Sequence, residues 1–333
     1  MAATLSDSVL THFNVPSADI GSVHFRPNGE DLLILSRTSG LLQYSIMRKV
    51  RPFSFQASNF TPSAASYNTD GNKIYGASFQ GQICAWIQFK SQPIAQKNGH
   101  PVPISDLKYI SATDQIVTSS NDKTIKIWSS NLEFLRSISG DFQFTCLAIS
   151  PIDNNILSGD LNGNIIFWDP SKKRPQTTKL TDQLDPKPKV WEKSFRLKGH
   201  NSIRSISYDH TGMLICVSTQ DGHLSIWDNT GSKIIQMHKI PPSLVLFHPK
   251  NPMILTASET NSIPSIIDLT LATQLYTFEA HQKPLCGAAW SPNGKLFATA
   301  DRDGVVIVWK MPKNKVIPSF VTKTGEPYTP PTE

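Results

Sequence analysis

The chain contains residues whose types and spacing could perform nucleophilic chemistry. The stretch TSSNDKTIKIWSSN at 118–131 combines hydroxyls, a carboxylate and an indole, and His100 precedes it. A serine, a histidine and an aspartate are the components of a catalytic triad, in which the imidazole accepts the proton of the nucleophilic hydroxyl. A second set of similar residues follows further along the chain: His200, Thr219, Asp221 and Trp227.

These sets lack the context of an active site. An active site is usually unique in a chain, whereas this set recurs, and no GxSxG turn presents a serine beside an oxyanion hole. Phosphate-binding and metalloprotease motifs are also absent from the sequence. The four cysteines form no CxxC pair, which disfavours a zinc or redox site. We therefore expect no catalytic residue, metal site, cofactor or small-molecule substrate.

The same residues instead mark an internal repeat. The segment TSSNDKTIKIW at 118–128 matches VSTQDGHLSIW, TADRDGVVIVW, GASFQGQICAW and SGDLNGNIIFW, and two weaker copies end near Ser45 and Ile267. Successive tryptophan-equivalent positions then lie near forty residues apart, except for one interval of 59: the positions are 45, 86, 128, 168, 227, 267 and 309.

Each unit has the pattern of four short strands joined by turns. Apolar runs alternate with turn signals such as Pro27-Asn28-Gly29 and Thr211-Gly212, and helical periodicity is scarce. A repeat near forty residues with this pattern is typical of a WD40 propeller blade. We therefore predict an all-β, seven-bladed WD40 β-propeller. A propeller must close to protect its sheet edges, and Val9–Phe13 can supply the outer strand of the seventh blade.

This organisation predicts a single domain with two flanking segments. Residues 1–8 are expected to form a flexible N-terminus, residues 9–310 the propeller, and residues 311–333 an extended, proline-rich tail. The sequence has no apolar run long enough to span a membrane, and its first residues do not have the pattern of a secretory signal.

Several dipeptides carry a resemblance to the WD40 family over nearly the whole chain. Gly-His occurs at 99–100 and 199–200, and Trp-Asp occurs at 168–169 and 227–228. The resemblance implies that a buried hydrogen-bonded chain of histidine, hydroxyl, aspartate and tryptophan stabilises two of the blades. On this interpretation the structural sets are His100, Ser120, Asp122 and Trp128, and His200, Thr219, Asp221 and Trp227.

The one long interval contains a basic insertion at about 170–193. Residues 170–198 hold nine lysines and arginines and three acids, so the net charge of this segment is +6. The formal net charge of the whole chain is also +6. One interpretation is an electrostatic arm for an acidic surface, and the other is a solvated insertion without a partner. Few aromatic residues interleave the charges, so nucleic acid is not favoured. The candidate partner-binding residues, including a smaller cluster in blade one, are Arg48, Lys49, Arg51, Lys172, Lys173, Arg174, Lys179, Lys187 and Lys189.

Three stretches resemble a narrower group, the centriolar proteome-of-centriole protein one family. They are LTHFNVPSADIGSVHF, IVTSSNDKTIKIWSSNLEFLRSIS and residues 266–310. The resemblance implies binding to microtubules in the walls of centrioles and basal bodies. The family usually also has a C-terminal coiled coil, which residues 311–333 do not resemble.

Three hypotheses about function follow. The first is a non-enzymatic scaffold that binds tubulin in the microtubule wall and adjacent cytoskeletal proteins, located in the cytoplasm and cytoskeleton at a centriole, basal body or flagellar axoneme. The second is a general adaptor, of the ubiquitin-ligase or chromatin type, that recognises a peptide or protein on the top face of the propeller. The third is an RNA-associated propeller. None of them involves a membrane partner.

Overall fold

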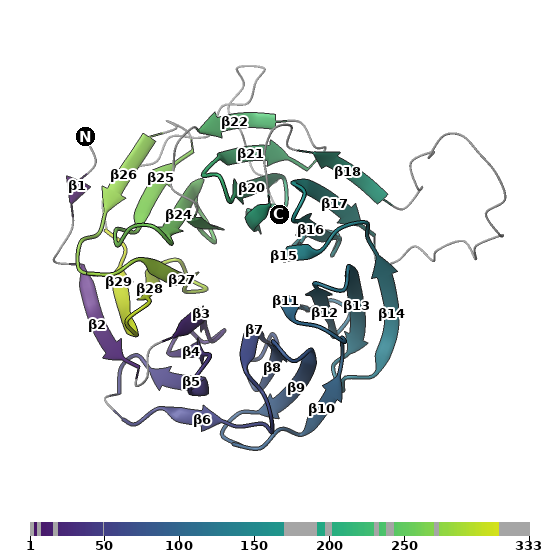
Figure 1. The fold of residues 1–333 in the computed structure, drawn as a ribbon. Helices are drawn as coiled ribbons and strands as arrows, with labels where there is room; N and C mark the ends of the chain where they lie inside the picture. The colour runs from purple at the N-terminus through teal and green to yellow at the C-terminus, as the bar shows by residue number, and fades with distance from the viewer. Residues whose placement is uncertain are drawn as a thin grey trace.

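Seven antiparallel sheets are arranged radially around a central axis, as in a propeller (Figure 1). The computed structural model describes residues 3–4, 8–15, 19–48, 50–169, 192–196, 202–229, 233–237, 243–269 and 273–312. Every element assigned in these ranges is a strand. The all-β, seven-bladed prediction is therefore confirmed.

Each blade consists of four consecutive strands, numbered from the central axis outward, with exceptions only in blades 6 and 7. Blades 1 to 4 are formed by β3 (Ile20–Phe25), β4 (Asp31–Ser36), β5 (Gly40–Ser45) and β6 (Phe53–Phe55); β7 (Pro62–Tyr67), β8 (Lys73–Ser78), β9 (Gln82–Ile87) and β10 (Ala95–Asn98); β11 (Ile104–Ile110), β12 (Gln115–Ser120), β13 (Thr124–Ser129) and β14 (Phe134–Ser139); and β15 (Phe144–Ile149), β16 (Ile156–Asp160), β17 (Asn164–Trp168) and β18 (Glu192–Arg196).

The remaining three blades continue the ring. They are formed by β19 (Ile203–Tyr208), β20 (Leu214–Thr219), β21 (Leu224–Asp228) and β22 (Lys233–Met237); β23 (Ser243–Phe247), β24 (Met253–Ser258), β25 (Ser265–Asp268) and β26 (Thr273–Thr277); and β27 (Leu285–Trp290), β28 (Leu296–Asp301) and β29 (Val305–Lys310), to which β2 (Val9–Asn14) adds as the fourth strand. A two-residue strand, β1 (Ala3–Thr4), pairs in parallel with β26 inside the segment predicted to be a flexible N-terminus.

The hydrophobic core lies between blades. Seven clusters of buried apolar side chains are present, and each one joins two adjacent blades, including blades 7 and 1. The second strands are buried on both faces, as the runs LLILS in β4 and MILTAS in β24 show. A strand between two apolar interfaces needs apolar or small residues at every position, which explains why these segments do not alternate.

The ring closes as the sequence predicts. Strand β2 pairs antiparallel with β29, from Val9 opposite Trp309 to Asn14 opposite Val305. Leu10 and Phe13 pack against the apolar cluster between blades 7 and 1. Strand β2 thereby covers the outer edge of β29, so blade 7 combines a strand from near the start of the chain with three strands from its last part (Figure 1).

The structure also revises two details of the sequence-based register. In blades 2, 3, 5 and 7 the tryptophan pairs with the second residue of the second strand, as Trp128 does with Ile116. In blade 1 that partner is Tyr44, not the predicted Ser45, because Leu32 pairs with Tyr44. The outer strand β18 spans Glu192–Arg196, so it begins within the last two residues of the insertion predicted at about 170–193.

Removal of the closing strand should destabilise the propeller strongly. Deletion of residues 1–14 removes the β2–β29 ladder and the packing of Leu10 and Phe13, so we expect the free energy of unfolding to fall by at least about 3 kcal/mol. Deletion of residues 1–7 keeps β2 and serves as the control, with a loss of about 1 kcal/mol or less. Urea unfolding followed by tryptophan fluorescence would measure both. Equal midpoints for the two deletions would contradict the closure argument.

Candidate functional site

A hydrogen-bonded chain inside blade 3 connects the middle of the sheet to two loops. The Trp128 indole N–H donates to Thr118 Oγ1 over 3.0 Å, and Thr118 Oγ1 lies 2.8 Å from His100 Nε2. His100 Nδ1 in turn lies 2.8 Å from a carboxylate oxygen of Asp122. Tryptophan can only donate and an ionised carboxylate can only accept, so the chain has one direction: indole to threonine, threonine to Nε2, and Nδ1–H to Asp122.

The hydroxyl in this chain is Thr118, which corrects the prediction of Ser120. Both side chains lie on the same face of β12, and Trp128 pairs with Ile116 on that strand. Ser120 is two residues further from Ile116 than Thr118 is, a difference of about 7 Å along the strand. The Ser120 hydroxyl instead donates to the Pro103 carbonyl over 2.9 Å and accepts the Asp122 N–H over 3.2 Å. It therefore supports the turn and does not contact the imidazole.

Blade 7 contains a second complete chain that the sequence interpretation only partly recognised. Trp309 donates to Thr299 over 2.8 Å, Thr299 lies 2.7 Å from His281 Nε2, and His281 Nδ1 lies 2.7 Å from Asp301. The sequence signal that finds both chains is a hydroxyl ten residues before the tryptophan. The aspartate is less regular, because Asp301 is eight residues before Trp309 whereas Asp122 is six before Trp128.

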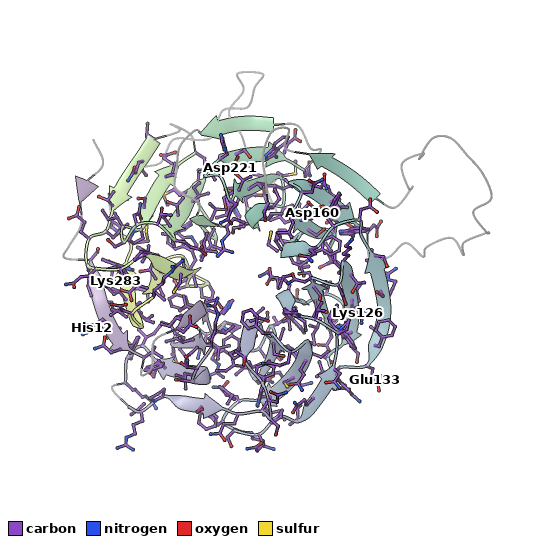
Figure 2. All side chains as sticks on the ribbon, viewed as in Figure 1. His12, Lys126, Glu133, Asp160, Asp221 and Lys283 are labelled. Atoms are coloured by element: carbon purple, nitrogen blue, oxygen red, sulfur yellow. The ribbon has the colours of Figure 1, made fainter. Side chains whose placement is uncertain are left out.

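In other blades, different groups accept the hydrogen bond of the buried indole N–H. In blade 4, Trp168 donates to Ser158, and the Asp160 carboxylate accepts bonds from Asn162 and Asn164 where a histidine would otherwise donate. Asp160 and Asp221 are labelled in Figure 2, in neighbouring blades. In blade 2, the Trp86 indole donates to the Gln56 carbonyl.

The predicted set in blade 5 is described only in part. Val217 occupies the place of Thr118, so Trp227 donates to Ser225 on its own strand over 2.8 Å and does not contact the predicted Thr219. Thr219 donates to Asp221, as a turn-capping hydroxyl would. His200 lies outside the described residues.

The electrostatics of these chains are those of structural groups. Burial lowers the pKa of the His100 and His281 imidazoles, against the opposing effect of their aspartates, so both rings are neutral at pH 7. Although burial opposes it, hydrogen bonds from Thr124 and His100 lower the pKa of Asp122. A general base needs a free nitrogen within reach of a substrate, whereas both ring nitrogens here have partners inside the blade. We therefore assign the chains to the support of the loops.

The loops that these chains hold surround the mouth of a central channel. Strands within a blade are antiparallel, so the turn after each second strand and the connection into the next inner strand lie at the same end of the propeller. His100 belongs to such a connection and Asp122 to such a turn. Their bond ties the two segments together at this end.

A cavity of about 440 Å³ occupies the channel. Inner strands of all seven blades contribute to its lining. In six of these strands a β-bulge follows the first residue, and the extra residue lines the cavity in every case: Gly21, Ser63, Ser105, Thr145, Arg204 and Cys286. A bulge re-aims a side chain, so the five bulge residues other than Gly21 present side chains to the channel.

A ring of side chains that we call the rim surrounds the mouth. In six blades, the residue directly after the second strand donates its N–H to the carbonyl of the residue that precedes the inner strand, for example Phe79 to Thr61 and Arg302 to Pro284. This shared bond fixes equivalent backbone positions around the ring. With the equivalent position of blade 6, the rim comprises Arg37, Phe79, Asn121, Leu161, Gln220, Glu259 and Arg302.

Charged groups of the rim and channel interact with one another. Arg204, from the bulge of β19, pairs with Glu259, and Arg302 Nη2 lies 4.0 Å from the other carboxylate oxygen of Glu259. On the other side of the mouth, Arg37 lies 3.1 Å from Asp19 and its guanidinium lies 5.4 Å from the ring centroid of Phe79. Burial, together with the charges of Arg302 and Arg37, lowers the pKa of Arg204.

Apolar side chains lie exposed on the same end of blades 2 to 4. Phe79 is 39% exposed, Leu161 is 48% exposed and Phe142 is 41% exposed. The Leu161 N–H donates to the carbonyl of Gln143, so the turn of Leu161 is held beside the connection that carries Phe142. Large exposed apolar side chains next to charged groups are typical of interaction surfaces.

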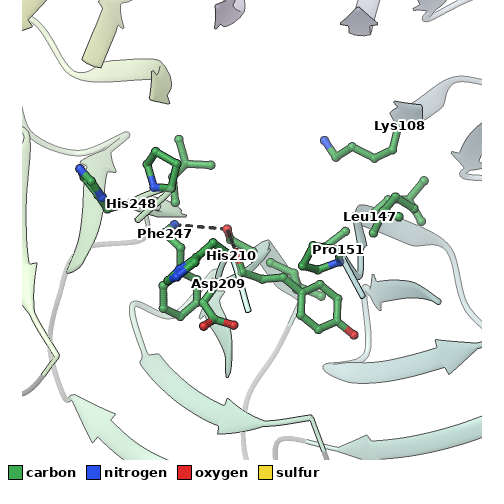
Figure 3. A pocket seen from close by; sticks show the side chains of 14 residues that line it. Lys108, Leu147, Pro151, Asp209, His210, Phe247 and His248 are labelled. Atoms are coloured by element: carbon green, nitrogen blue, oxygen red, sulfur yellow. Dashed lines mark hydrogen bonds between the residues drawn. The ribbon is translucent and has the colours of Figure 1, made fainter. Parts of the chain in front are cut away.

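A second hollow, of about 380 Å³, lies at the inner-strand ends of blades 4 to 6 (Figure 3). Its prominent polar groups have partners. His248 Nε2–H donates to the Gly294 carbonyl over 3.1 Å, and its Nδ1 accepts the N–H groups of Lys250 and Asn251. The dashed bond joins the Phe247 N–H to the Ser207 hydroxyl over 3.2 Å. Because these groups connect blades, the hollow is the weaker candidate.

The predicted basic residues are placed only in part. Arg48 and Arg51 are exposed in the connection between β5 and β6, at the end of the propeller opposite the rim. Lys49, Lys172, Lys173, Arg174, Lys179, Lys187 and Lys189 lie outside the described residues, as do residues 313–333 of the predicted tail.

Within the described ranges, no three histidine, cysteine or acidic side chains are grouped so that they could hold a metal ion. The same part of the chain contains no helix of the length and apolarity needed to cross a membrane.

Comparison with known proteins agrees with this fold. The family model described as WD domain, G-beta repeat matches four segments: 91–129, 132–169, 191–228 and 272–310. Together with the seven sheets, these matches define the chain as a seven-bladed β-propeller that contains WD40 repeats.

Three relatives illustrate the range of similar proteins. The Arabidopsis thaliana transcriptional corepressor LEUNIG_HOMOLOG is 26% identical over 297 residues, covering 78% of this chain and 37% of that protein. The ribosome biogenesis protein YTM1 of Scheffersomyces stipitis is 23% identical over 296 residues, covering 76% and 63%. The COMPASS component SWD3 of Saccharomyces cerevisiae is 25% identical over 266 residues, covering 78% and 80%. The chain thus spans less than two thirds of the first two relatives. None of these three names contains a microtubule or centriolar term, so the narrower resemblance stays a prediction.

The revised hydrogen-bonded chain can be tested by two neighbouring substitutions. Thr118→Val keeps the shape but leaves the Trp128 N–H and His100 Nε2 buried without partners, so we expect a loss of about 2–4 kcal/mol in the free energy of unfolding. Ser120→Ala removes only turn contacts and should cost about 1 kcal/mol. Chemical denaturation of both variants provides the comparison. A larger effect of Ser120→Ala would restore the original assignment.

Proposed function

We propose that this propeller is a non-enzymatic adaptor that binds a peptide or protein segment across the rim. The observation that carries the proposal is the combination, at one mouth of the channel, of exposed apolar side chains, arginines and an open cavity. A surface of this kind can bury an apolar anchor while polar groups around it set orientation. The described histidine, hydroxyl and aspartate sets are used inside blades, which supports a binding role.

The relatives support the same class of function. Two of the three are named as parts of regulatory or multi-protein systems, a corepressor and a COMPASS component, and the third is named for ribosome biogenesis. We infer that the present chain likewise joins other macromolecules. The relatives' particular partners are not carried over, because a propeller fold hosts many unrelated functions.

The rim should determine partner capture. We expect the triple variant Phe79→Ser, Leu161→Ser and Arg302→Glu to lose its most enriched partners at least tenfold in proximity labelling, because it removes two anchors and reverses a charge. The control triple, Phe89→Ser, Lys90→Glu and Ile94→Ser, makes matched changes in the connection between β9 and β10, at the opposite end. Loss of partners only with the control triple would place the interaction surface elsewhere.

A second candidate function is the microtubule scaffold at a centriole, basal body or axoneme. It is favoured by the basic composition of residues 170–198 and by the exposed Arg48 and Arg51. The acidic outer surface of a microtubule would attract such a segment, and added salt would screen the attraction. This hypothesis and the adaptor hypothesis use different parts of the molecule.

Microtubule binding can be tested directly. If the insertion contacts tubulin, purified protein should co-sediment with microtubules in a salt-sensitive manner, and Lys172→Glu, Lys173→Glu, Arg174→Glu, Lys187→Glu and Lys189→Glu together should reduce pelleting at least tenfold. The rim triple variant is the control and should pellet like the wild type. Unchanged pelleting of the charge-reversed protein would exclude the insertion as the tubulin contact. Absence of the tagged protein from centrioles, basal bodies and axonemes would exclude a scaffold function at these structures.

A further inference from the structure

We propose that the segment bound at the rim presents an aspartate or glutamate carboxylate, flanked by apolar residues, and that this carboxylate enters the channel mouth beside Arg204. The inference rests on the proposed adaptor function and specifies the chemistry of its partner. It is drawn from three features of the mouth: donors without partners, one carboxylate shared by two arginines, and an adjoining apolar arc.

Two donors that line the cavity are buried without hydrogen-bond partners. They are Nε of Arg204 and the hydroxyl of Ser63, both at bulge positions of inner strands. Other bulge hydroxyls have partners: Ser105 lies 2.8 Å from Ser119, and Thr145 donates to the Ile203 carbonyl over 2.7 Å. A buried donor without a partner costs about 1–3 kcal/mol, so an acceptor that reached the cavity would be stabilised there.

The arginines at the mouth outnumber the carboxylates that pair with them. Three arginines, Arg37, Arg204 and Arg302, face two carboxylates, Asp19 and Glu259. Glu259 is shared between Arg204 and Arg302, so one guanidinium charge has no carboxylate of its own. A carboxylate of the bound segment would give this guanidinium a partner.

The Asp301 carboxylate, one residue before Arg302, is buried and bonded to His281, so it adds negative charge below the mouth and is engaged inside blade 7. Deeper in the lining, Lys108 lies 3.0 Å from Asp106, which also accepts the Leu147 N–H. That pair is complete without a ligand. Because low-dielectric walls strengthen the field of the remaining arginines, the mouth attracts anions and disfavours a lysine or arginine side chain.

The apolar arc defines what flanks the carboxylate. Phe79 lies next to Arg37 through their ring contact, and Leu161 with Phe142 continue the exposed apolar surface two blades further around. Asn121 is exposed on the rim between them. An extended segment crossing this arc would pack apolar side chains against Phe79 and Leu161 while its acidic residue points into the channel.

The cavity is large enough for this arrangement. Its volume of about 440 Å³ exceeds the roughly 30 Å³ that one water occupies in the liquid by more than tenfold. It therefore accommodates a carboxylate side chain together with the waters that bridge it to the wall. Arginine donors suit a carboxylate because the planar guanidinium can offer two parallel N–H groups.

Selection from a random nine-residue peptide library displayed on phage, with the purified full chain as bait, tests the inference. We expect enrichment of a central aspartate or glutamate with apolar neighbours. In fluorescence anisotropy, exchange of that residue for its amide should weaken binding of the selected peptide at least tenfold, because a charge-assisted bond is lost. Enrichment of basic or purely apolar sequences would overturn the carboxylate assignment.

Variants at the mouth make the test specific. Arg302→Ala and Phe79→Ala should each weaken the selected peptide about tenfold, whereas Arg51→Ala, a matched exposed arginine at the opposite end, should not. Glu259→Gln removes the internal carboxylate that Arg204 and Arg302 share. This variant should therefore bind the selected peptide several-fold more tightly. Weaker binding to Glu259→Gln would contradict the proposal. Arg204→Gln should also weaken binding about tenfold, and Arg302→Ala keeps the proposal testable if the Arg204 variant does not fold.

The outcomes separate this inference from the adaptor function. If partner capture depends on the rim triple variant but selected peptides contain no acidic preference, the adaptor function stands and the carboxylate is wrong. If neither partner capture nor any peptide depends on the rim, the adaptor function itself fails. A requirement for phosphoserine in place of glutamate would likewise overturn the carboxylate and retain the rim.

Discussion

The antiparallel pairing of β2 with β29 is the constraint on which the rest of the structure depends. The propeller has no single core, because its apolar residues form seven layers between adjacent blades. Each layer needs two blades, so an open ring would leave the edge of β29 and one side of blade 7 without cover. Closure by the N-terminal strand joins the first and last parts of the chain and makes every layer equivalent.

Within this ring, buried indoles connect the sheets to the loops. A tryptophan N–H inside a blade must have an acceptor, and different blades meet this need with different groups. In blades 3 and 7 the acceptor is a threonine that continues through a histidine to a turn aspartate. In blade 4 a serine suffices, and the Asn164 side chain and the Asn162 backbone N–H complete the turn at Asp160. The complete chains lie where Asn121 and Arg302 are presented, so the stability of the sheet and the geometry of the rim are linked.

The rim shows how a repetitive scaffold produces one asymmetric surface. Its seven positions follow the second strands of the seven blades, and in six of them a recurring N–H to carbonyl bond fixes the backbone. Their side chains differ: two arginines, a glutamate, two apolar residues and two amides. The sheets therefore determine where these groups lie, and the residue chosen at each turn determines the chemistry. The basic insertion that breaks the repeat is a separate feature of the sequence, and the rim does not depend on it.

The sequence by itself determined the repeat, the number of blades and the closing strand, because these follow from short-range patterns: strand length, turn residues and tryptophan spacing. Tertiary structure decided which groups meet. The register of β12 and β13 selects Thr118 over Ser120, a difference of one strand period that a pattern of hydroxyls does not resolve. The bulge in β19 turns Arg204 toward the channel, where it meets Glu259 from another blade. Most successive rim residues are some forty positions apart in sequence and become neighbours when consecutive blades pack together. Arg302 and Arg37 become neighbours only when the ring closes, because blade 7 then packs against blade 1.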